Sequence, residues 1–306
     1  MRPALSVIFF TVSSGAGLGL LIYLALMGIA DKVPTSAMIP MLLVGLGLTT
    51  AGLISSTLHL ANPKNAWRAF SKFRTSWLSR EGVLAVALYP VAILYGLLLV
   101  AKAPAVATTM VALLLALIAL GVLYCTGMIY ACLKTIPRWH TPLVPTSYIL
   151  LGLYSGALVA LPLVAYAGGA VAHTATLALL GAALLVKGFY YFRFRAPATA
   201  FTINDALPIG KKTIRLLDVG HTHGTFLTDE FYFKLARGHA LMLRIVAIVA
   251  GFGVPVLALA AGASGVVSLS IVALVCLLGL LAERWLFFAE AEHVVRLYHG
   301  ATKVAR

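Results

Sequence analysis

The sequence has few charged residues and few groups able to hold a metal or a redox centre. Only 10% of its 306 residues are charged and 61% are hydrophobic, against roughly 25% and 45–50% in soluble domains. A soluble fold of this length could not bury that much apolar surface. Apolar runs of about 20 residues are long enough to cross a bilayer. The composition therefore excludes an ordinary soluble enzyme and predicts an all-α, polytopic membrane protein.

Cysteine and histidine patterns typical of redox centres are missing. Cys125, Cys132 and Cys276 lie within or at the edge of apolar runs, and no two have CxxC spacing. They encode neither an iron–sulfur cluster nor a zinc site, and we expect buried, inert thiols. No histidine pair lies deep in an apolar run, and the GHTHG stretch alone is a weak metal signal. We expect no haem, iron–sulfur cluster or metal in this chain.

Eight apolar runs predict a single domain, residues 1–306, that forms a bundle of eight transmembrane helices. We expect the helices at about 4–29, 36–61, 81–102, 105–132, 146–168, 174–192, 239–263 and 266–289. The loops between them include the polar intervals 62–80, 133–145 and 193–238. Three prolines argue against a regular helix in the second interval. Gly45, Gly47 and Gly52 predict close packing of the second helix.

The net charge of +14 comes mainly from cations at one end of the predicted helices. Eighteen Lys and Arg residues lie on the side of the termini and polar intervals, against only Lys32 and Lys102 on the other side. Cytoplasmic loops carry such an excess, so we expect a bacterial inner-membrane protein with both termini and all large loops in the cytoplasm. Cations beside apolar runs serve topology and contact membrane lipids, which argues against nucleic acid as a partner.

Residues 59–81 form the most polar short stretch, with an ionisable residue at each end. His59 ends one predicted helix and Glu81 begins the next, so both are expected at the same membrane face. An imidazole and a partly desolvated carboxyl group suit a quinone, which exchanges two protons in each turnover. The alternative is structural: His59 would satisfy a helix carbonyl, and Glu81 would favour a helix N-terminus or pair with Arg80.

Further charged residues lie within apolar runs, among them Glu283, Arg284 and Lys187. Glu283 and Arg284, in the last run, either make structural contacts, such as an Arg284–Glu81 pair, or take part in function. Lys187 lies near a helix end, and we expect it to snorkel to the surface.

The loop between His59 and Glu81 carries a pattern of aromatic and basic residues. Its aromatic residues are spaced as on one face of a helix lying in the membrane interface: Trp67, Phe70, Phe73 and Trp77. Such a helix would anchor in lipid or present its basic residues to a partner protein.

The stretch HLANPKNAW…SWLSRE resembles the signature loop of the dimethyl sulfoxide reductase anchor-subunit family. That family has a His-Leu-Gly-x-Pro motif, an aromatic and basic loop, and Leu-Ser-x-Glu at the start of the third helix; here Ala61 replaces the glycine. The turn at 136–139, the Glu283–Arg284 pair and the helix count also match, so the resemblance covers essentially the whole chain. The opening RPALSVIFFTVSSGAGLGL and the loop ending LDVGHTHGTFLTDEF are most similar to anchors of sulfite-oxidising complexes.

The resemblance implies an anchor that exchanges electrons between a quinone and an iron–sulfur subunit. A molybdopterin-containing catalytic subunit would complete the complex, and electrons would pass from sulfite to ubiquinone or menaquinone. The quinone-site His and Glu of the family map onto His59 and Glu81. The further quinone-site candidates are Trp67, Arg80, Glu283 and Arg284. The expected docking residues are Arg68, Lys72, Arg74, Trp77, Arg138 and Trp139.

Three alternatives to this function remain at this point. The chain could belong to a dimethyl sulfoxide reductase-type complex that oxidises menaquinol. It could be a purely structural anchor, with quinone bound elsewhere. A secondary transporter is the third, although no internal repeat supports it. In none of these would the chain act alone as the enzyme for the substrate.

Overall fold

The computed structural model describes residues 4–58, 62–195, 200–207, 214, 217–218, 235–299, 301 and 303–305. In this part of the chain, eight helical stretches are long and apolar enough to cross a membrane. Seven are single helices: α1 (Leu5–Ile29), α2 (Thr35–Thr57), α3 (Trp77–Val100), α4 (Ala105–Ala131), α5 (Leu143–Tyr166), α6 (His173–Arg195) and α11 (Val266–Ala289). The eighth combines α9 (Leu235–Ile248), the π-helical η2 (Val249–Gly253) and α10 (Val254–Ala260). The predicted all-α membrane fold is confirmed.

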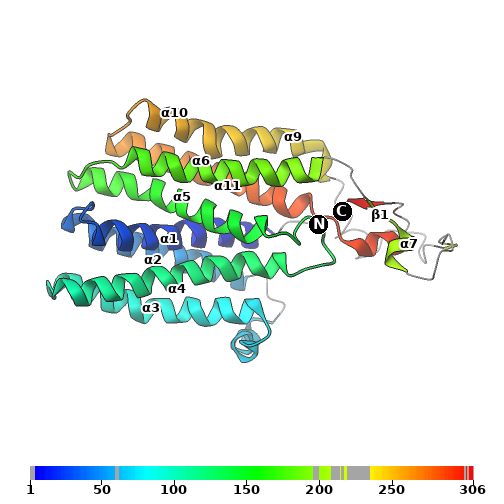
Figure 1. Ribbon diagram of the computed structural model, residues 1–306, viewed down its shortest axis with the longest axis horizontal. Coiled ribbons are helices and arrows are strands. Elements are labelled where there is room, and N and C mark those ends of the chain that lie inside the picture. The colour runs from blue at the N-terminus through cyan, green and yellow to red at the C-terminus, as the bar shows by residue number, and fades with distance from the viewer. Residues whose placement is uncertain are drawn as a thin grey trace.

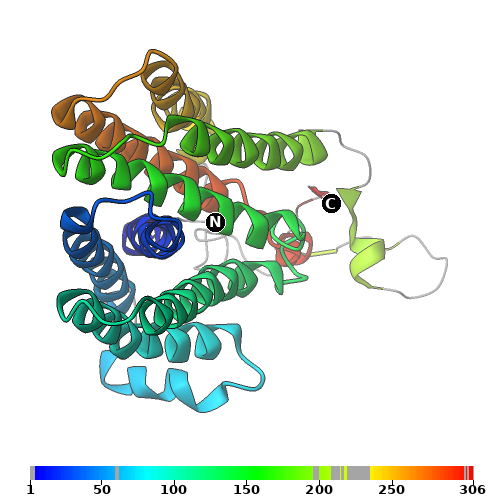
Figure 2. The same cartoon turned by 60° about the vertical axis from the view of Figure 1, so that its left-hand side comes forward.

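Helix α1 lies at the centre of the bundle. It packs against α2, α4, α5 and α11, and every residue from Phe10 to Ala25 is buried. In Figure 1, α2, α3 and α4 lie on one side of α1 and α5, and α6, α9, α10 and α11 lie on the other. Figure 2 shows α1 nearly end-on between the two groups. A helix that is apolar on all sides suits such an enclosed position.

Glycines bring α1 and α5 into backbone contact. A Cβ atom added at Gly19 would overlap the Gly152 carbonyl, and one added at Gly156 would overlap the Gly19 carbonyl carbon. Small residues at helix interfaces allow this approach in membranes, where van der Waals contact replaces the hydrophobic effect as the driving force. The α1–α5 contact therefore depends on these positions having no side chain.

The small residues of α2 pack as predicted at two of three positions. A Cβ atom at Gly45 would lie 2.8 Å from Leu21, and one at Gly52 would lie 2.7 Å from the Ser14 amide, both on α1. Gly47 faces open space, with no atom within 4 Å of an added Cβ. The packing expectation therefore does not hold for Gly47.

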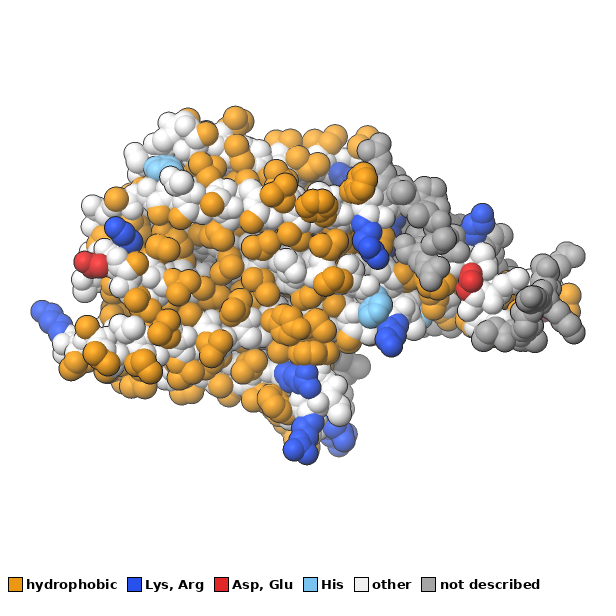
Figure 3. Space-filling view, viewed as in Figure 1, with side chains coloured by type: hydrophobic (Ala, Val, Ile, Leu, Met, Phe, Trp, Pro, Cys, Tyr) orange, Lys and Arg blue, Asp and Glu red, His pale blue; other side chains and the backbone are white. Residues whose placement is uncertain are grey.

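Both described ends of the chain and the longer connections lie at the same end of the bundle, which we call the loop end (Figure 1). Short connections, residues 30–34, 101–104, 167–172 and 261–265, form the opposite end. Figure 3 shows apolar side chains covering the helices, with most of the visible cations toward the loop end. The smaller elements are η1, a 3₁₀ helix (Pro63–Lys72), β1 (Ala200–Phe201), α7 (Ile203–Ala206), η3, also 3₁₀ (Val294–His299), and β2 (Val304–Ala305), with β1 and β2 paired antiparallel.

Helix α3 begins four residues earlier than expected, at Trp77. The side chain of Ser76 accepts a hydrogen bond from the Ser79 amide at 3.4 Å, as an N-cap serine does.

Helix α5 begins at Leu143, inside the interval expected to be irregular. Pro145 lies in its first turn, where a proline removes no intrahelical hydrogen bond. The expected 239–263 helix is interrupted by the π-helical η2.

Gly156→Ala would force a methyl group against the α1 backbone, and we expect it to lower stability by about 1–3 kcal/mol, the usual cost of overpacking. Gly47→Ala adds the same group to another spanning helix in open space and serves as the matched control. Thermal unfolding of both proteins in detergent checks this. Equal transition temperatures for the two variants would contradict the α1–α5 contact.

Candidate functional site

Glu81 is a buried carboxyl group near the loop end of α3. It is 4% exposed and accepts a short hydrogen bond from the Thr126 hydroxyl of α4. That hydroxyl also lies 2.9 Å from the Val122 oxygen. A hydroxyl has one hydrogen and cannot donate fully to both acceptors. If Glu81 carried a proton, it could donate to the Thr126 oxygen, and the Thr126 hydrogen would be free for the Val122 carbonyl. The geometry can therefore accommodate a proton on Glu81.

No ion pair joins Glu81 to a described cation. His59, its proposed companion, lies outside the described residues, which resume at Asn62. The pairing of His59 with Glu81 therefore stays a prediction.

Ser79 holds η1 against the first turn of α3. Its buried hydroxyl donates a short hydrogen bond to the Ala69 carbonyl and accepts one from the Lys72 amide at 3.1 Å. The ring of Phe70 lies beside Gly82, where an added Cβ would be 3.2 Å away. These contacts fix the loop relative to the helix turn that carries the buried carboxyl.

Arg80 faces the loop and makes no ion pair with Glu81. Its Nε and Nη2 donate to the carbonyls of Phe73 and Arg74 at 3.0 and 2.7 Å, and its guanidinium lies 4.3 Å from the centroid of the Trp77 ring. The Arg80–Glu81 pair, one of the structural alternatives for Glu81, is therefore not formed. Arg80 closes the turn between η1 and α3, and its part in quinone binding stays a prediction.

The aromatic residues of η1 face outwards. A 3₁₀ helix repeats every three residues, so Trp67, Phe70 and Phe73 share one face, with exposed fractions of 63%, 44% and 46%. Trp77 belongs to α3 and is partly buried, with its ring edge-to-face with Tyr124 at 5.7 Å. The predicted stripe of four aromatics is therefore a stripe of three, and Trp67 belongs to the exposed surface.

The basic docking candidates of this loop lie on the surface. Arg68, Lys72 and Arg74 are all exposed, and the Arg68 guanidinium lies 5.7 Å from the Trp67 ring centroid. Their positions suit contact with a partner or with lipid headgroups.

Glu283 joins α6 to α11 through buried ion pairs. Its carboxylate lies in close contact with Lys187 Nζ and 3.6 Å from Arg284 Nε, and all three residues are at most 4% exposed. Lys187 therefore does not snorkel, and Arg284 pairs with its sequence neighbour instead of Glu81. An unpaired buried charge is costly, so one carboxylate shared by two cations helps these charges remain in the membrane.

Aromatic side chains pack against Arg284. The Arg284 guanidinium is 3.8 Å from the Tyr148 ring centroid, and Tyr148 stacks on Tyr130 at 5.6 Å. Arg284 therefore contacts Tyr148 and Glu283, and it does not form the alternative pair with Glu81.

The turn before α5 is tied to α11 from inside. Trp139 is buried, stacks on Phe287 at 5.4 Å and donates from Nε1 to the Phe287 carbonyl at 3.2 Å. Arg138 Nη1 lies 3.3 Å from Glu290, which also binds Arg244 at 2.6 Å. Trp139 is therefore an internal anchor and does not offer the docking surface expected of it, and Arg138 is engaged within the chain.

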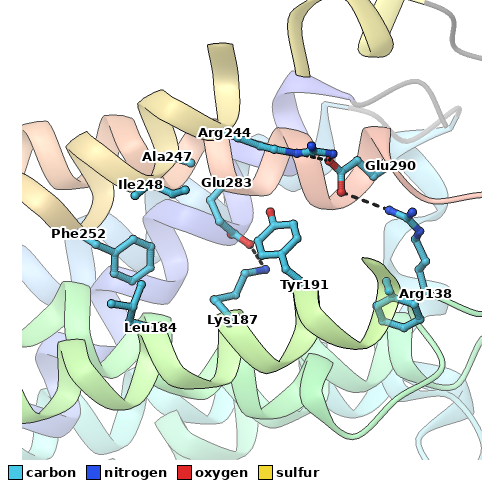
Figure 4. Close-up of a pocket in the computed structure, with 12 residues that line it drawn as sticks. Arg138, Leu184, Lys187, Tyr191, Arg244, Ala247, Ile248, Phe252, Glu283 and Glu290 are labelled. Carbon is cyan, nitrogen blue, oxygen red and sulfur yellow. Dashed lines mark hydrogen bonds and ion pairs between the residues drawn. The ribbon is translucent and has the colours of Figure 1, made fainter. Parts of the chain in front are cut away.

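A pocket of about 540 Å³ lies between α6, α9, η2 and α11 (Figure 4). Charged residues of its wall include Lys187, Glu283, Arg244 and Glu290, and Leu184, Ile248 and Phe252 are among its apolar residues. Sequence reasoning missed the pocket because its wall comes from distant segments. It also missed Ser79 and Thr126, whose hydroxyls do not stand out in an apolar run.

All three cysteine thiols were expected to be buried, and the structure agrees at two of the three positions. Cys125 and Cys276 are buried, whereas Cys132 is exposed. In the described part of the chain, no group of three or more His, Cys, Asp or Glu side chains could hold a metal ion.

Ser79→Ala removes the hydroxyl that makes both contacts with η1, at a cost of roughly 1–3 kcal/mol. We expect faster proteolysis and faster amide exchange in residues 63–75. Ser71→Ala is the control, because the Ser71 hydroxyl is exposed and bonds only to the Arg68 carbonyl within η1. Unchanged exchange in Ser79→Ala would show that other contacts hold the loop.

Two comparisons with known proteins agree with this architecture. The family model described as "DMSO reductase anchor subunit (DmsC)" matches residues 1–289. The chain is also 35% identical to a sulfite dehydrogenase subunit of Allochromatium vinosum, across 98% of this chain and 99% of that protein. Both matches extend over almost the whole sequence, including the buried carboxyl group, the loop above it and the last helix. The chain therefore belongs to the DMSO reductase anchor subunit family.

Proposed function

We propose that the chain is the quinone-reactive membrane anchor of a sulfite-oxidising complex. One observation carries the proposal: Glu81 is a buried, hydrogen-bonded carboxyl at the loop end of a chain 35% identical to a sulfite dehydrogenase subunit. An anchor subunit implies catalytic and electron-transfer partners. We assign these partners as a molybdenum catalytic subunit and an iron–sulfur subunit. Electrons would pass from sulfite through the catalytic subunit and then the iron–sulfur subunit to the membrane quinone.

The residues around Glu81 fit a quinone headgroup. A buried carboxyl can hold a proton, Thr126 orients it, and the ring of Phe70 lies beside the next residue, Gly82. A bound quinone would supply two-electron, two-proton redox chemistry. Glu81 would move one proton at its carboxyl oxygen, and His59, at the other end of the loop, would exchange the second.

The loop end is the proposed docking face for the partner subunits. Lys and Arg residues are concentrated there in the sequence, and Arg68, Lys72 and Arg74 are exposed beside the Glu81 helix turn. Under the positive-inside rule this face is cytoplasmic, in the bacterial inner membrane. A partner docked there would lie above the buried carboxyl group, which is the arrangement that electron transfer to a quinone at Glu81 requires.

The family description favours a second candidate, the anchor of a DMSO reductase-type complex that oxidises menaquinol. The same residues would then accept protons from the quinol instead of supplying them. The name of the sulfite dehydrogenase relative and the cation excess at the loop end both favour sulfite oxidation in the cytoplasm.

Glu81→Gln removes the proton-exchanging carboxyl but keeps its shape. In the purified complex we expect quinone reduction to fall by about 10²–10⁴-fold, the usual contribution of a general acid or base. Reduction of an artificial dye by the partner subunits should stay at the wild-type rate. His59→Ala should behave similarly, and Glu292→Gln, at a carboxylate paired with Arg296 outside the spans, is the control. Normal quinone turnover in Glu81→Gln would refute this role.

Reversing the charge at Arg68 and Arg74 tests the docking face. We expect Arg68→Glu/Arg74→Glu to weaken binding of the iron–sulfur subunit, with the loss diminishing as salt screens the interaction. Lys32→Glu, at the exposed opposite end of the bundle, is the control. Co-purification at several salt concentrations provides the measurement. If both variants retain the partner equally, the basic loop is a lipid anchor and the docking surface lies elsewhere.

A further inference from the structure

We propose that the pocket between α6, α9 and α11 is a second quinone-binding site, separate from the one at Glu81. The inference rests on the proposed function for its class of ligand. The pocket lies among the helices on one side of α1 and α5, and Glu81 belongs to α3 on the other (Figures 1 and 4). Its volume of about 540 Å³ is within the range of small-molecule sites, roughly 300–1,000 Å³.

The polar groups of the pocket stand at two depths. Glu283 and Glu290 are separated by two turns of α11, about 10 Å along the helix axis. Lys187 joins Glu283 at the inner level, and Arg244 and Arg138 join Glu290 at the outer level. A ligand that contacts the polar groups at both depths needs polar atoms on two opposite sides of an apolar body. A quinone ring, with oxygens on opposite edges, has this pattern, whereas a phospholipid has its polar groups at one end.

Two lining residues have polar atoms that a quinone or quinol could satisfy. Oε2 of Glu283, 3.6 Å from Arg284 Nε, and Nε of Arg138 are both buried and have no hydrogen-bond partner among the described residues. Glu283 is 2% exposed, and its other oxygen, Oε1, is in close contact with Lys187 Nζ. Buried polar atoms normally have partners. A quinol hydroxyl can donate to Glu283, and a quinone carbonyl can accept from Arg138.

The charges and the mouth of the pocket suit a neutral, lipid-soluble ligand. Both carboxylates are already paired with cations, so a neutral ring can enter without breaking an ion pair, while a phosphate would be held against Glu283 or Glu290. Leu184, Gly188 and Ile248 line the pocket and are also exposed on the lipid-facing surface. A quinone could therefore enter from the bilayer and leave its tail in the lipid.

The apolar wall is fixed by the π-helical segment. A Cβ atom at Gly279 of α11 would overlap the Gly251 backbone, and Tyr154 donates to the Gly251 carbonyl at 2.9 Å. The neighbouring Phe252 lines the pocket and stacks on Tyr154 at 5.9 Å. Single π-helical turns occur frequently at functional sites. The wall is thus positioned by contacts from two other helices.

Gly188→Phe is the sharpest test, because Gly188 lines the pocket and an added Cβ meets no atom within 4 Å. Gly181→Phe is the matched control, since Gly181 lies two turns away on the same helix and also has open space around it. The full chain in nanodiscs is photolabelled with an azido-quinone, and the labelled peptides are mapped. We expect label in residues 184–194 or 244–252, reduced roughly tenfold or more by Gly188→Phe and unchanged by Gly181→Phe.

The other outcomes separate this inference from the proposed function. Label confined to peptides around Glu81, or pocket label that Gly188→Phe does not reduce, would overturn the second site while leaving quinone chemistry at Glu81 intact. Loss of pocket label when phosphatidylglycerol replaces phosphatidylcholine in the nanodisc would identify the pocket as a phospholipid site. Failure of the wild-type complex to reduce quinone would instead refute the proposed function, whatever the label pattern.

Discussion

The backbone contact between α1 and α5 at Gly19, Gly152 and Gly156 sets the layout of the whole bundle. It encloses α1, so the remaining helices must pack around a central pair. They divide into one group that carries Glu81 and another that forms the pocket beside Glu283. The two polar clusters are separate because their helices lie on opposite sides of α1 and α5.

The second constraint is that lipid cannot satisfy a polar group, so each one within a span needs a partner inside the protein. Glu81 of α3 finds Thr126 of α4, and Glu283 of α11 is shared by Lys187 of α6 and Arg284. The Glu81–Thr126 and Glu283–Lys187 contacts each join two helices. All of them lie in the loop-end part of the spans. The chemistry that these groups support is thereby confined to the membrane face where a partner would dock.

Composition and run length predict the all-α membrane fold because a helix that crosses a bilayer needs about 20 mostly apolar residues. The contacts that place the site depend on residues far apart in the chain, which single-sequence patterns do not reveal. The distance of Lys187 from a helix end predicts that it snorkels. Its carboxylate partner, Glu283, belongs to α11, so the sequence around Lys187 does not reveal the ion pair. Trp139 is predicted to be exposed because it follows a basic residue in a polar interval, yet its ring stacks on Phe287. Glu81 can be picked out from the sequence because it ends a conspicuous polar loop. Its partner Thr126 cannot, because a single threonine in an apolar run belongs to no recognisable pattern.

The aromatic cluster at the loop end decides how ligands could reach the two polar sites. Tyr130, Tyr148, Phe287 and Phe288 pack against one another between α4, α5 and α11, with ring centroids 5.2–5.9 Å apart in the contacting pairs. Such close-packed rings leave no passage for a molecule as large as a quinone. A ligand at Glu81 and a ligand in the pocket would therefore enter from lipid on different sides of the bundle. The rings therefore separate the two sites sterically.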